Sequence, residues 1–301
     1  MKSLANIRLM QPADIPFGMN LVQQAGWNQV EADWRRALAL QPEGCFVAEQ
    51  SGTPAGTVTT CRFGSVAWIA MVLVDTAARN QGIGKRLMEH AMAHLDGLGV
   101  ETQRLDATVL GKGLYEKLGF TAEYEVVRMK GIAKAAEDIE TDAMRWTSDT
   151  RDATLLALDA RVTATDRTIF LHELAGSHPF FYSLFEDGLG YAGSRKGRNA
   201  VQIGPAAASG PEVGRQLCNA MLHHFSGLPV FVDIPVPNKA ALRWARSVGL
   251  EEQRRFVRMY RGKKLSDCPE MIWAKLGTRK GLGILKSVIQ LSVKKLSGAI
   301  R

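Results

Sequence analysis

The stretch ARNQGIGKRL, residues 78–87, places Gly82 and Gly84 directly before a run of apolar residues at helical spacing. Glycines at such a position let backbone N–H groups close around an anion at the start of a helix, where the helix dipole favours negative charge. The stretch therefore predicts a strand, an anion-binding loop and a helix in succession. The apolar face of that helix consists of Ile83, Leu87, Ala91 and Leu95.

The flanking sequence supplies the rest of a layered fold. Three β-rich runs separated by turn signals precede the loop and predict an antiparallel meander over residues 45–75. After the helix, the pattern predicts a strand, a short helix that stops at Gly119, and a last strand. This order of elements indicates an α/β fold. The later elements are predicted over 102–109, 113–119 and 122–129.

The same pattern returns 130 residues further along the chain. Sliding the chain against itself without gaps superposes IGKRLMEHAMAHLDGLGV (83–100) on VGRQLCNAMLHHFSGLPV (213–230), and the register holds to VRM at 127–129 and 257–259. One register kept over so many positions indicates two copies of one domain. We expect a first domain over 1–132, a polar linker over 133–143, a second domain over 144–277 and a basic tail over 278–301.

Composition narrows the class of protein. A chain of 301 residues with 46% hydrophobic and 23% charged residues is typical of a soluble protein with two ordinary cores. Six of the 38 lysines and arginines lie in residues 278–301, which contain no acid, so the rest carries 32 basic against 30 acidic residues. The net charge of +8 therefore belongs to the tail, and no nucleic-acid partner is expected.

Cysteines and histidines give no sign of a metal or a disulfide framework. The four cysteines share no short spacing, and the adjacent pair His223 and His224 points in directions about 100° apart on a helix with no third ligand near. No leader and no run of about 18 apolar residues is present, so a reduced cytoplasmic protein is expected. The cysteines are Cys45, Cys61, Cys218 and Cys268.

Two common phosphate loops do not fit RNQGIG. A nucleoside-triphosphate loop needs a glycine five residues before its Gly-Lys pair and a Ser or Thr after it, where this chain has Arg79 and Arg86. A dinucleotide loop needs a third glycine, which would fall at Leu87, and an acidic residue about 20 positions on.

The remaining pattern, Arg-x-x-Gly-x-Gly between a strand and a helix, resembles the pyrophosphate loop of the Gcn5-related N-acetyltransferase (GNAT) family. MVLVDTAARNQGIGKRL (71–87) followed by LYEKLGF (114–120) is similar to the two best-known signatures of that family. The resemblance covers residues 7–130, and beyond them it rests mainly on the repeat. It implies two tandem GNAT-like domains, each a mixed, mostly antiparallel sheet flanked by helices, with the second copy degenerate.

The resemblance also implies an acetyl-CoA site. Backbone N–H groups from Asn80 to Gly84 would bind the pyrophosphate, strand residues 72–74 would bind the pantetheine arm, and Tyr115 would protonate the leaving thiolate. Gly82 would permit close approach of the ligand, and Gly84 close packing of helix and sheet. The alternatives are a plain turn and a packed tyrosine. The implied acetyl-CoA residues are Val72, Leu73, Val74, Arg79, Asn80, Gln81, Gly82, Ile83 and Gly84.

The acceptor side is less defined in the sequence. Asp106 and Thr108 alternate onto one face of their strand, which makes Asp106 the candidate general base, with a solvated strand face as the alternative. Trp27 and Trp34 lie seven residues apart and would share one face of a helix that begins before Trp27. In the family this segment often forms a wall of the acceptor site; core packing is the alternative.

The second copy lacks the chemistry of the first. In the 130-residue register Arg79 becomes Ser209, Gly82 becomes Glu212 and Tyr115 becomes Ala245. A carboxylate at Glu212 would repel pyrophosphate, so one acetyl-CoA site per chain is expected. The second copy would then shape the acceptor pocket, with Asp166–Arg167 and Arg195 presenting charge there or forming ordinary salt bridges.

The expected function is acetyl transfer from acetyl-CoA to an amine of a small molecule, by direct attack in a ternary complex. Acetylation of a protein or peptide and non-catalytic acyl-CoA sensing are the alternatives. The tail has an apolar stripe from Leu282 to Ile300 with lysines elsewhere, which suits a membrane surface or docking on a protein. The sequence indicates no particular oligomeric state.

Overall fold

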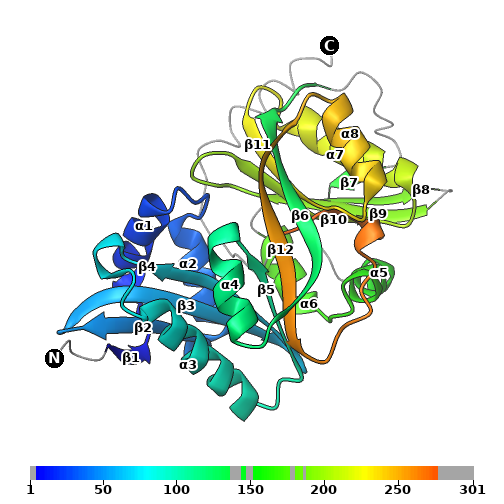
Figure 1. Cartoon of the computed structure of the whole chain (residues 1–301). Coiled ribbons are helices and arrows are strands. Elements are labelled where there is room, and N and C mark those ends of the chain that lie inside the picture. The colour runs from blue at the N-terminus through cyan, green and yellow to red at the C-terminus, as the bar shows by residue number, and fades with distance from the viewer. Residues whose placement is uncertain (1–4, 136–143, 147–151, 177–179, 186–187, 277–301) are drawn as a thin grey trace.

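One mixed sheet runs through both halves of the chain in the computed structural model, which describes residues 5–135, 144–146, 152–176, 180–185 and 188–276. Figure 1 shows two lobes, each with helices against its part of the sheet. The mixed, helix-flanked sheets expected from the sequence are confirmed. The strand order in this sheet is β1-β2-β3-β4-β5-β12-β6-β11-β10-β9-β8-β7, with β13 paired to β10.

The first lobe is built on the predicted meander. Its strands pair antiparallel from β1 to β4, whereas β4 and β5 are parallel. Along β2 the side chains alternate, with Cys45 and Val47 packing under α1 and α2 and Phe46 and Ala48 packing under α3. The elements are β1 (Asn6–Leu9), α1 (Ile15–Gln24), α2 (Glu31–Leu40), β2 (Cys45–Gln50), β3 (Thr53–Phe63), β4 (Val66–Val74), α3 (Ile83–Gly97), β5 (Thr102–Ala107) and α4 (Val109–Lys117).

The second lobe repeats this plan. Its strands β10 and β11 are parallel, as β4 and β5 are, and α7 follows β10 as α3 follows β4. The elements are β7 (Met144–Trp146), α5 (Ala153–Thr163), α6 (Thr168–Ala175), β8 (Phe180–Phe185), β9 (Gly188–Arg195), β10 (Val201–Ala208), α7 (Pro211–His224), β11 (Pro229–Pro235), α8 (Lys239–Ser247) and β13 (Ile272–Ala274).

The last strands of the two copies are exchanged. β6 (Thr121–Ile132) follows the first lobe in sequence but pairs with β11, and β12 (Glu251–Gly262) crosses back to pair with β5. Figure 1 shows β6 and β12 side by side between the lobes, where they also pair with each other. The strand predicted over 122–129 therefore completes the other half of the sheet.

A buried ion pair marks each crossing. The repeated VRM supplies both arginines: Nε of Arg258 lies 2.7 Å from Asp106 on β5, and Nε of Arg128 lies 2.7 Å from Asp233 on β11. Each pair joins facing positions of two antiparallel strands. The two exchanged strands are thus held by the same charge pattern.

Close packing of helix on sheet occurs at Gly214 of α7 rather than at Gly84 of α3. A Cβ atom at Gly214 would lie 1.9 Å from Cε2 of Trp273, whereas a Cβ atom at Gly84 would meet only Cγ2 of Val74, at 3.6 Å. The close approach that the sequence suggested at Gly84 is therefore a requirement of the second copy.

We expect Gly214→Ala to lower the free energy of unfolding by about 1–3 kcal/mol, the usual cost of overpacking. Gly84→Ala is the matched control, which should keep the stability or raise it by up to about 1 kcal/mol because alanine restricts the unfolded chain. Urea denaturation of both variants measures the difference. Equal stabilities would contradict the assignment of Trp273 as the obstacle.

Two expected segments fall wholly or partly outside the described residues. The linker over 133–143 is described only to residue 135, where Ala133 packs into the core of the second lobe, and the tail over 278–301 is outside. The domain limits remain predictions. Among the described helices, none combines the length and apolar character needed to span a membrane.

Candidate active site

The first lobe opens between β4 and β5. These parallel strands are paired only where Val66–Trp68 lies beside Thr102–Arg104, and beyond these residues they diverge. The space between the diverging strands is a pocket, with β4 on one side, β5 on the other and α4 beside it. Its lining consists of Trp27, Trp68, Ile69, Ala70, Met71, Val72, Leu105, Asp106, Thr108 and Tyr115.

A β-bulge lies on the β4 wall of this pocket. The register between β3 and β4 shifts between Thr57 and Thr59, and Met71 has a left-handed backbone with φ of 53°. The hydroxyl of Thr57 donates to the carbonyl of Met71 at 2.9 Å and holds the bulge in place. Because a bulge takes a residue out of the ladder, the backbone of β4 beside Val72 can bind an extended ligand arm.

The glycine loop continues from β4 and ends at the start of α3. Asn80 and Gly82 both have left-handed backbone conformations, with φ of 61° and 79°. The helical hydrogen bonds begin with the Arg86 N–H donating to the Gly82 carbonyl at 3.1 Å, so the preceding N–H groups lie outside the helix ladder. A Cβ atom at Gly82 would meet nothing within 4 Å, so that side of the loop is open. The loop fits an anionic phosphate group.

Neighbouring side chains hold the loop in shape. Gln24 donates to Asp75 at 2.9 Å, and this bond and the N–H of Ala77 hold the pKa of Asp75 below its usual value. Gln50 donates to Gln81 at 3.0 Å, and Nε of Arg79 donates to the carbonyl of Val74 at 3.3 Å. The loop is therefore organised by the chain itself.

Tyr115 reaches the pocket from α4. The hydroxyl of Thr108 caps this helix by accepting from the N–H of Gly111 at 3.3 Å. The ring of Tyr115 lies over Gly111, where a Cβ atom would come within 2.9 Å of it, and edge-on to Phe120. Gly111 and Phe120 together fix the ring of Tyr115 beside β4 and β5.

Asp106 lies in the pocket as expected from strand alternation, but its oxygens are held by two cations from the C-terminal part of the chain. Arg258 of β12 donates to it at 2.7 and 3.2 Å, and Nζ of Lys275, just after β13, donates at 2.8 and 3.1 Å. Neither residue is predicted from the sequence as part of the site. The repeated VRM run could have drawn attention to Arg258, whereas no sequence pattern marks Lys275.

The ion pairs continue away from the pocket. Arg258 donates to the hydroxyl of Tyr124 at 3.2 Å, and Tyr124 donates to Asp267 at 3.0 Å. Arg104 binds Asp267 and Glu123. Burial alone would lower the pKa of Arg104, but the bond to Glu123 and the charge of Asp267 raise it; burial raises the pKa of Tyr124. Every charged group in this buried network is paired.

The two tryptophans near the N-terminus have different roles. α2 begins at Glu31, so Trp27 is not on it and instead lines the pocket, whereas Trp34 is fully buried in the core. Of the charged residues considered for the second copy, Arg195 forms a buried pair with Asp33. Arg167 pairs with Asp159 and also lines a cavity between the lobes.

The equivalent opening in the second lobe is filled by the chain itself. β10 and β11 pair over Val201–Ile203 and then part, and β13 lies in the gap. It pairs with Ala206 and Ala207 of β10, and the N–H of Lys275 donates to the carbonyl of Asp233 on β11 at 2.7 Å.

The loop before α7 is also reduced. Residues 75–82 separate β4 from α3, but only 209–210 separate β10 from α7, and Glu212 pairs with Arg215 in the first turn of α7. No group of three or more metal-ligating side chains was found among the described residues of either lobe.

Comparisons with known proteins agree with this geometry. Two models described as an acetyltransferase (GNAT) domain match residues 41–122 and 155–274. Holothin acyltransferase of Pseudoalteromonas sp. (strain SANK 73390) is 26% identical over 243 residues, which cover 79% of this chain and 81% of the relative. The uncharacterized N-acetyltransferase YitH of Bacillus subtilis (strain 168) is 27% identical over 72% of this chain and 77% of its own length.

Solved structures show the same fold. A Pyrococcus horikoshii protein solved as a proposed acetyltransferase superposes with a TM-score of 0.80 at 23% identity, covering 92% of this chain and 96% of its own. A tandem GNAT protein from the clavulanic acid biosynthesis pathway gives 0.61 at 13% identity, over 88% of this chain and all of its own. With two matching domain models in one sheet, the chain belongs to the GNAT family as a tandem acyltransferase.

Proposed function

We propose that this acyltransferase moves an acetyl group from acetyl-CoA to the amine of a small molecule, by direct attack in a ternary complex. GNAT domains generally use acetyl-CoA or another acyl-CoA as donor. The observation that carries the proposal is the open pocket between β4 and β5, which is lined by Tyr115 and by the strand that leads into the glycine loop. Its counterpart between β10 and β11 is filled by β13.

The chain's own groups then have separate tasks. Backbone N–H groups of Asn80–Gly84 bind the pyrophosphate, and the backbone of residues 72–74 binds the pantetheine arm and polarises the thioester carbonyl. As the amine nitrogen bonds to the carbonyl carbon and the C–S bond breaks, the hydroxyl of Tyr115 protonates the leaving sulfur, and the proton released by the nitrogen restores the tyrosine hydroxyl through water.

Asp106 is the carboxylate of this pocket, and we assign it first to positioning. Both its oxygens accept hydrogen bonds from Arg258 and Lys275, so an amine would reach it only in competition with two cations. Its role as general base remains a prediction. The anchoring role has direct support from these bonds.

A small acceptor is favoured by the enclosure of the site. Trp68 at the back of the pocket and Arg258 behind it are 9% and 3% exposed, and the guanidinium of Arg258 lies over the indole at 4.1 Å from its centre. A folded protein surface could not reach so far in, whereas a small amine could. The relative named holothin acyltransferase is consistent with a small-molecule acceptor.

The test is a screen of the full-length chain with acetyl-CoA, following CoA release with a thiol reagent. Small amines, amino acids, polyamines and peptides serve as acceptors, and propionyl-CoA serves as the alternative donor. We expect at least one small amine to raise CoA release about tenfold or more over the acceptor-free rate, because a bound amine attacks the thioester from a fixed position. Turnover with peptides alone would identify a peptide N-acetyltransferase, and binding without any turnover an acyl-CoA sensor.

A further inference from the structure

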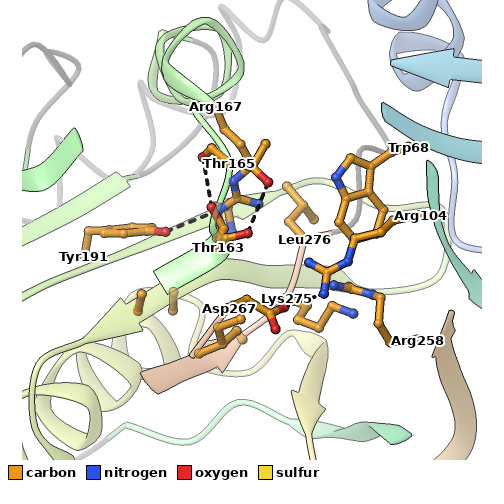
Figure 2. Close-up of a pocket in the computed structure, with 15 residues that line it drawn as sticks. Trp68, Arg104, Thr163, Thr165, Arg167, Tyr191, Arg258, Asp267, Lys275 and Leu276 are labelled. Atoms are coloured by element: carbon orange, nitrogen blue, oxygen red, sulfur yellow. Dashed lines mark hydrogen bonds and ion pairs between the residues drawn. The ribbon is translucent and has the colours of Figure 1, made fainter. Parts of the chain in front are cut away.

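A second cavity adjoins the acyl-transfer pocket, with Trp68 lining both. It lies between the two lobes. Figure 2 shows Trp68, Arg104 and Arg258 on one side and Arg167, Thr163, Thr165 and Tyr191 on the other, with Asp267 and Lys275 between them. The cavity lining thus contains four cations and one acid. An acceptor bound in the acyl-transfer pocket has this cavity directly behind Trp68.

Part of this charge belongs to the fold rather than to the site. The Arg258–Asp106 pair has a counterpart in Arg128–Asp233, with the same distance of 2.7 Å. The counterpart lies beside the filled opening of the second lobe, where no transfer chemistry is expected. One arginine on one carboxylate is therefore sufficient for the strand exchange.

Lys275 breaks this symmetry on the side of the open pocket. It adds a second cation to Asp106, so the group of Arg258, Lys275 and Asp106 carries one positive charge in excess. At the far end of the network Arg104 contacts two carboxylates, so the excess there is negative. Because Lys275 and Arg258 are almost fully buried, solvent screens this separation weakly.

Trp68 adds an unused donor at the same place. Its Nε1 is buried and has no hydrogen-bond partner among the described residues. Buried donors are nearly always paired, because an unpaired buried N–H has lost its hydrogen bond to water without a replacement. Nζ of Lys275 lies 6.0 Å from the centre of the indole, and its two contacts to Asp106 leave the ammonium a third donor. Both side chains line the same cavity, so one carboxylate group bound there has a cation and an N–H donor as partners.

We propose that the acceptor is an amine that also carries a carboxylate, which binds to Lys275 and to the indole N–H of Trp68. This inference rests on the proposed acetyl transfer and specifies its substrate class. Lys275 is then a specificity-determining residue contributed by the second copy. Polyamines are poor acceptors, because a second ammonium would lie beside Lys275 and Arg258, which share the single carboxylate of Asp106.

Two matched series of acceptors test the proposal. One consists of 4-aminobutyrate, its carboxamide and putrescine; the other of 4-(aminomethyl)benzoate, its carboxamide and p-xylylenediamine. In each series only the end remote from the amine changes from negative to neutral to positive. With rates compared at equal concentrations of neutral amine, we expect the carboxylate to have a kcat/KM about 10–100-fold above its carboxamide, the value of one charged hydrogen bond.

Lys275→Met removes the charge and keeps the length of the buried chain. It leaves Asp106 with one arginine, an arrangement that the Arg128–Asp233 pair shows to be compatible with the fold. We expect it to raise KM for the carboxylates about 10–100-fold more than it raises KM for the carboxamides. Lys275→Arg should restore most of the preference. Lys264→Met, an exposed lysine in the outer pocket lined by Glu123, is the control and should change neither.

Binding gives a readout that does not depend on turnover. Calorimetry of the CoA-loaded protein should show that the wild type binds the carboxylates more tightly than the carboxamides. Lys275→Met should bind the two kinds of ligand with equal affinity. Equal kcat/KM within both series, or equal losses for carboxylate and carboxamide in Lys275→Met, would overturn the carboxylate site while leaving acetyl transfer intact. If no amine is acetylated, the proposed function is wrong. If, in addition, no carboxylate binds in a way that depends on Lys275, the carboxylate site is wrong as well.

Discussion

Gly82→Glu should abolish acetyl-CoA binding in a chain that remains folded. A Cβ atom at this position would meet nothing within 4 Å, so the first atom of the new side chain has space. It extends into the open side of the loop where the pyrophosphate is proposed to bind. Two like charges about 4 Å apart near a protein surface repel by about 4 kcal/mol, or roughly 1000-fold in affinity.

Two further variants separate charge from backbone strain. Gly82 has φ of 79°, which costs any other residue about 1–3 kcal/mol, so part of the loss has nothing to do with charge. Gly82→Gln carries the same strain and nearly the same volume without the charge. We expect Gln to retain measurable binding where Glu has none, and thermal unfolding to be the same for both.

The same calorimetric titration counts the sites. The wild type should bind one acetyl-CoA per chain, because β13 fills the second opening and only residues 209–210 precede α7. The reciprocal change, Glu212→Gly, should not add a site, since it neither lengthens that loop nor removes β13. Two equivalent sites, or a folded Gly82→Glu chain that still binds, would refute the assignment of the glycine loop.

Tyr115→Phe should lower kcat about 10–10⁴-fold with little change in acetyl-CoA affinity, which is the range for loss of a general acid. The substitution removes only the hydroxyl. The phenylalanine ring keeps its place over Gly111 and its edge contact with Phe120, so the pocket keeps its shape. Steady-state rates with the best acceptor and calorimetry with acetyl-CoA give the two quantities.

Two controls make the Tyr115 result specific. The denaturation midpoint of Tyr115→Phe should match that of the wild type, which shows that the lost rate is not lost folded protein. A donor with a more acidic leaving thiol should recover part of the rate, because such a thiolate needs less protonation. Unchanged turnover would assign Tyr115 to packing alone.

Local patterns in the sequence were sufficient for the elements that form the donor side. Alternation along Cys45–Gln50 places the strand faces, and apolar spacing from Ile83 defines α3. The loop depends on glycine at position 82, because its φ is left-handed. Each of these features is encoded within a few residues, so each could be predicted.

The acceptor side could not be predicted in this way. The repeat reveals two copies, but identical VRM runs at 127–129 and 257–259 do not say which neighbour each strand takes. Asp106 was found from strand alternation, yet its partners Arg258 and Lys275 are 152 and 169 residues away in sequence. At Trp68 the sequence predicts only a strand, because the cavity behind this residue forms between the two lobes.

The sequence by itself determined two copies of one fold, a single glycine loop and a single tyrosine beside it, because helix periodicity, strand alternation and left-handed turns are local properties of the chain. Only the tertiary structure decided that β6 and β12 change places, that β13 fills the second opening, and that Lys275 reaches Asp106. These contacts depend on which distant strands pair and which charges are buried together. That choice is made by the free energy of the whole packed sheet.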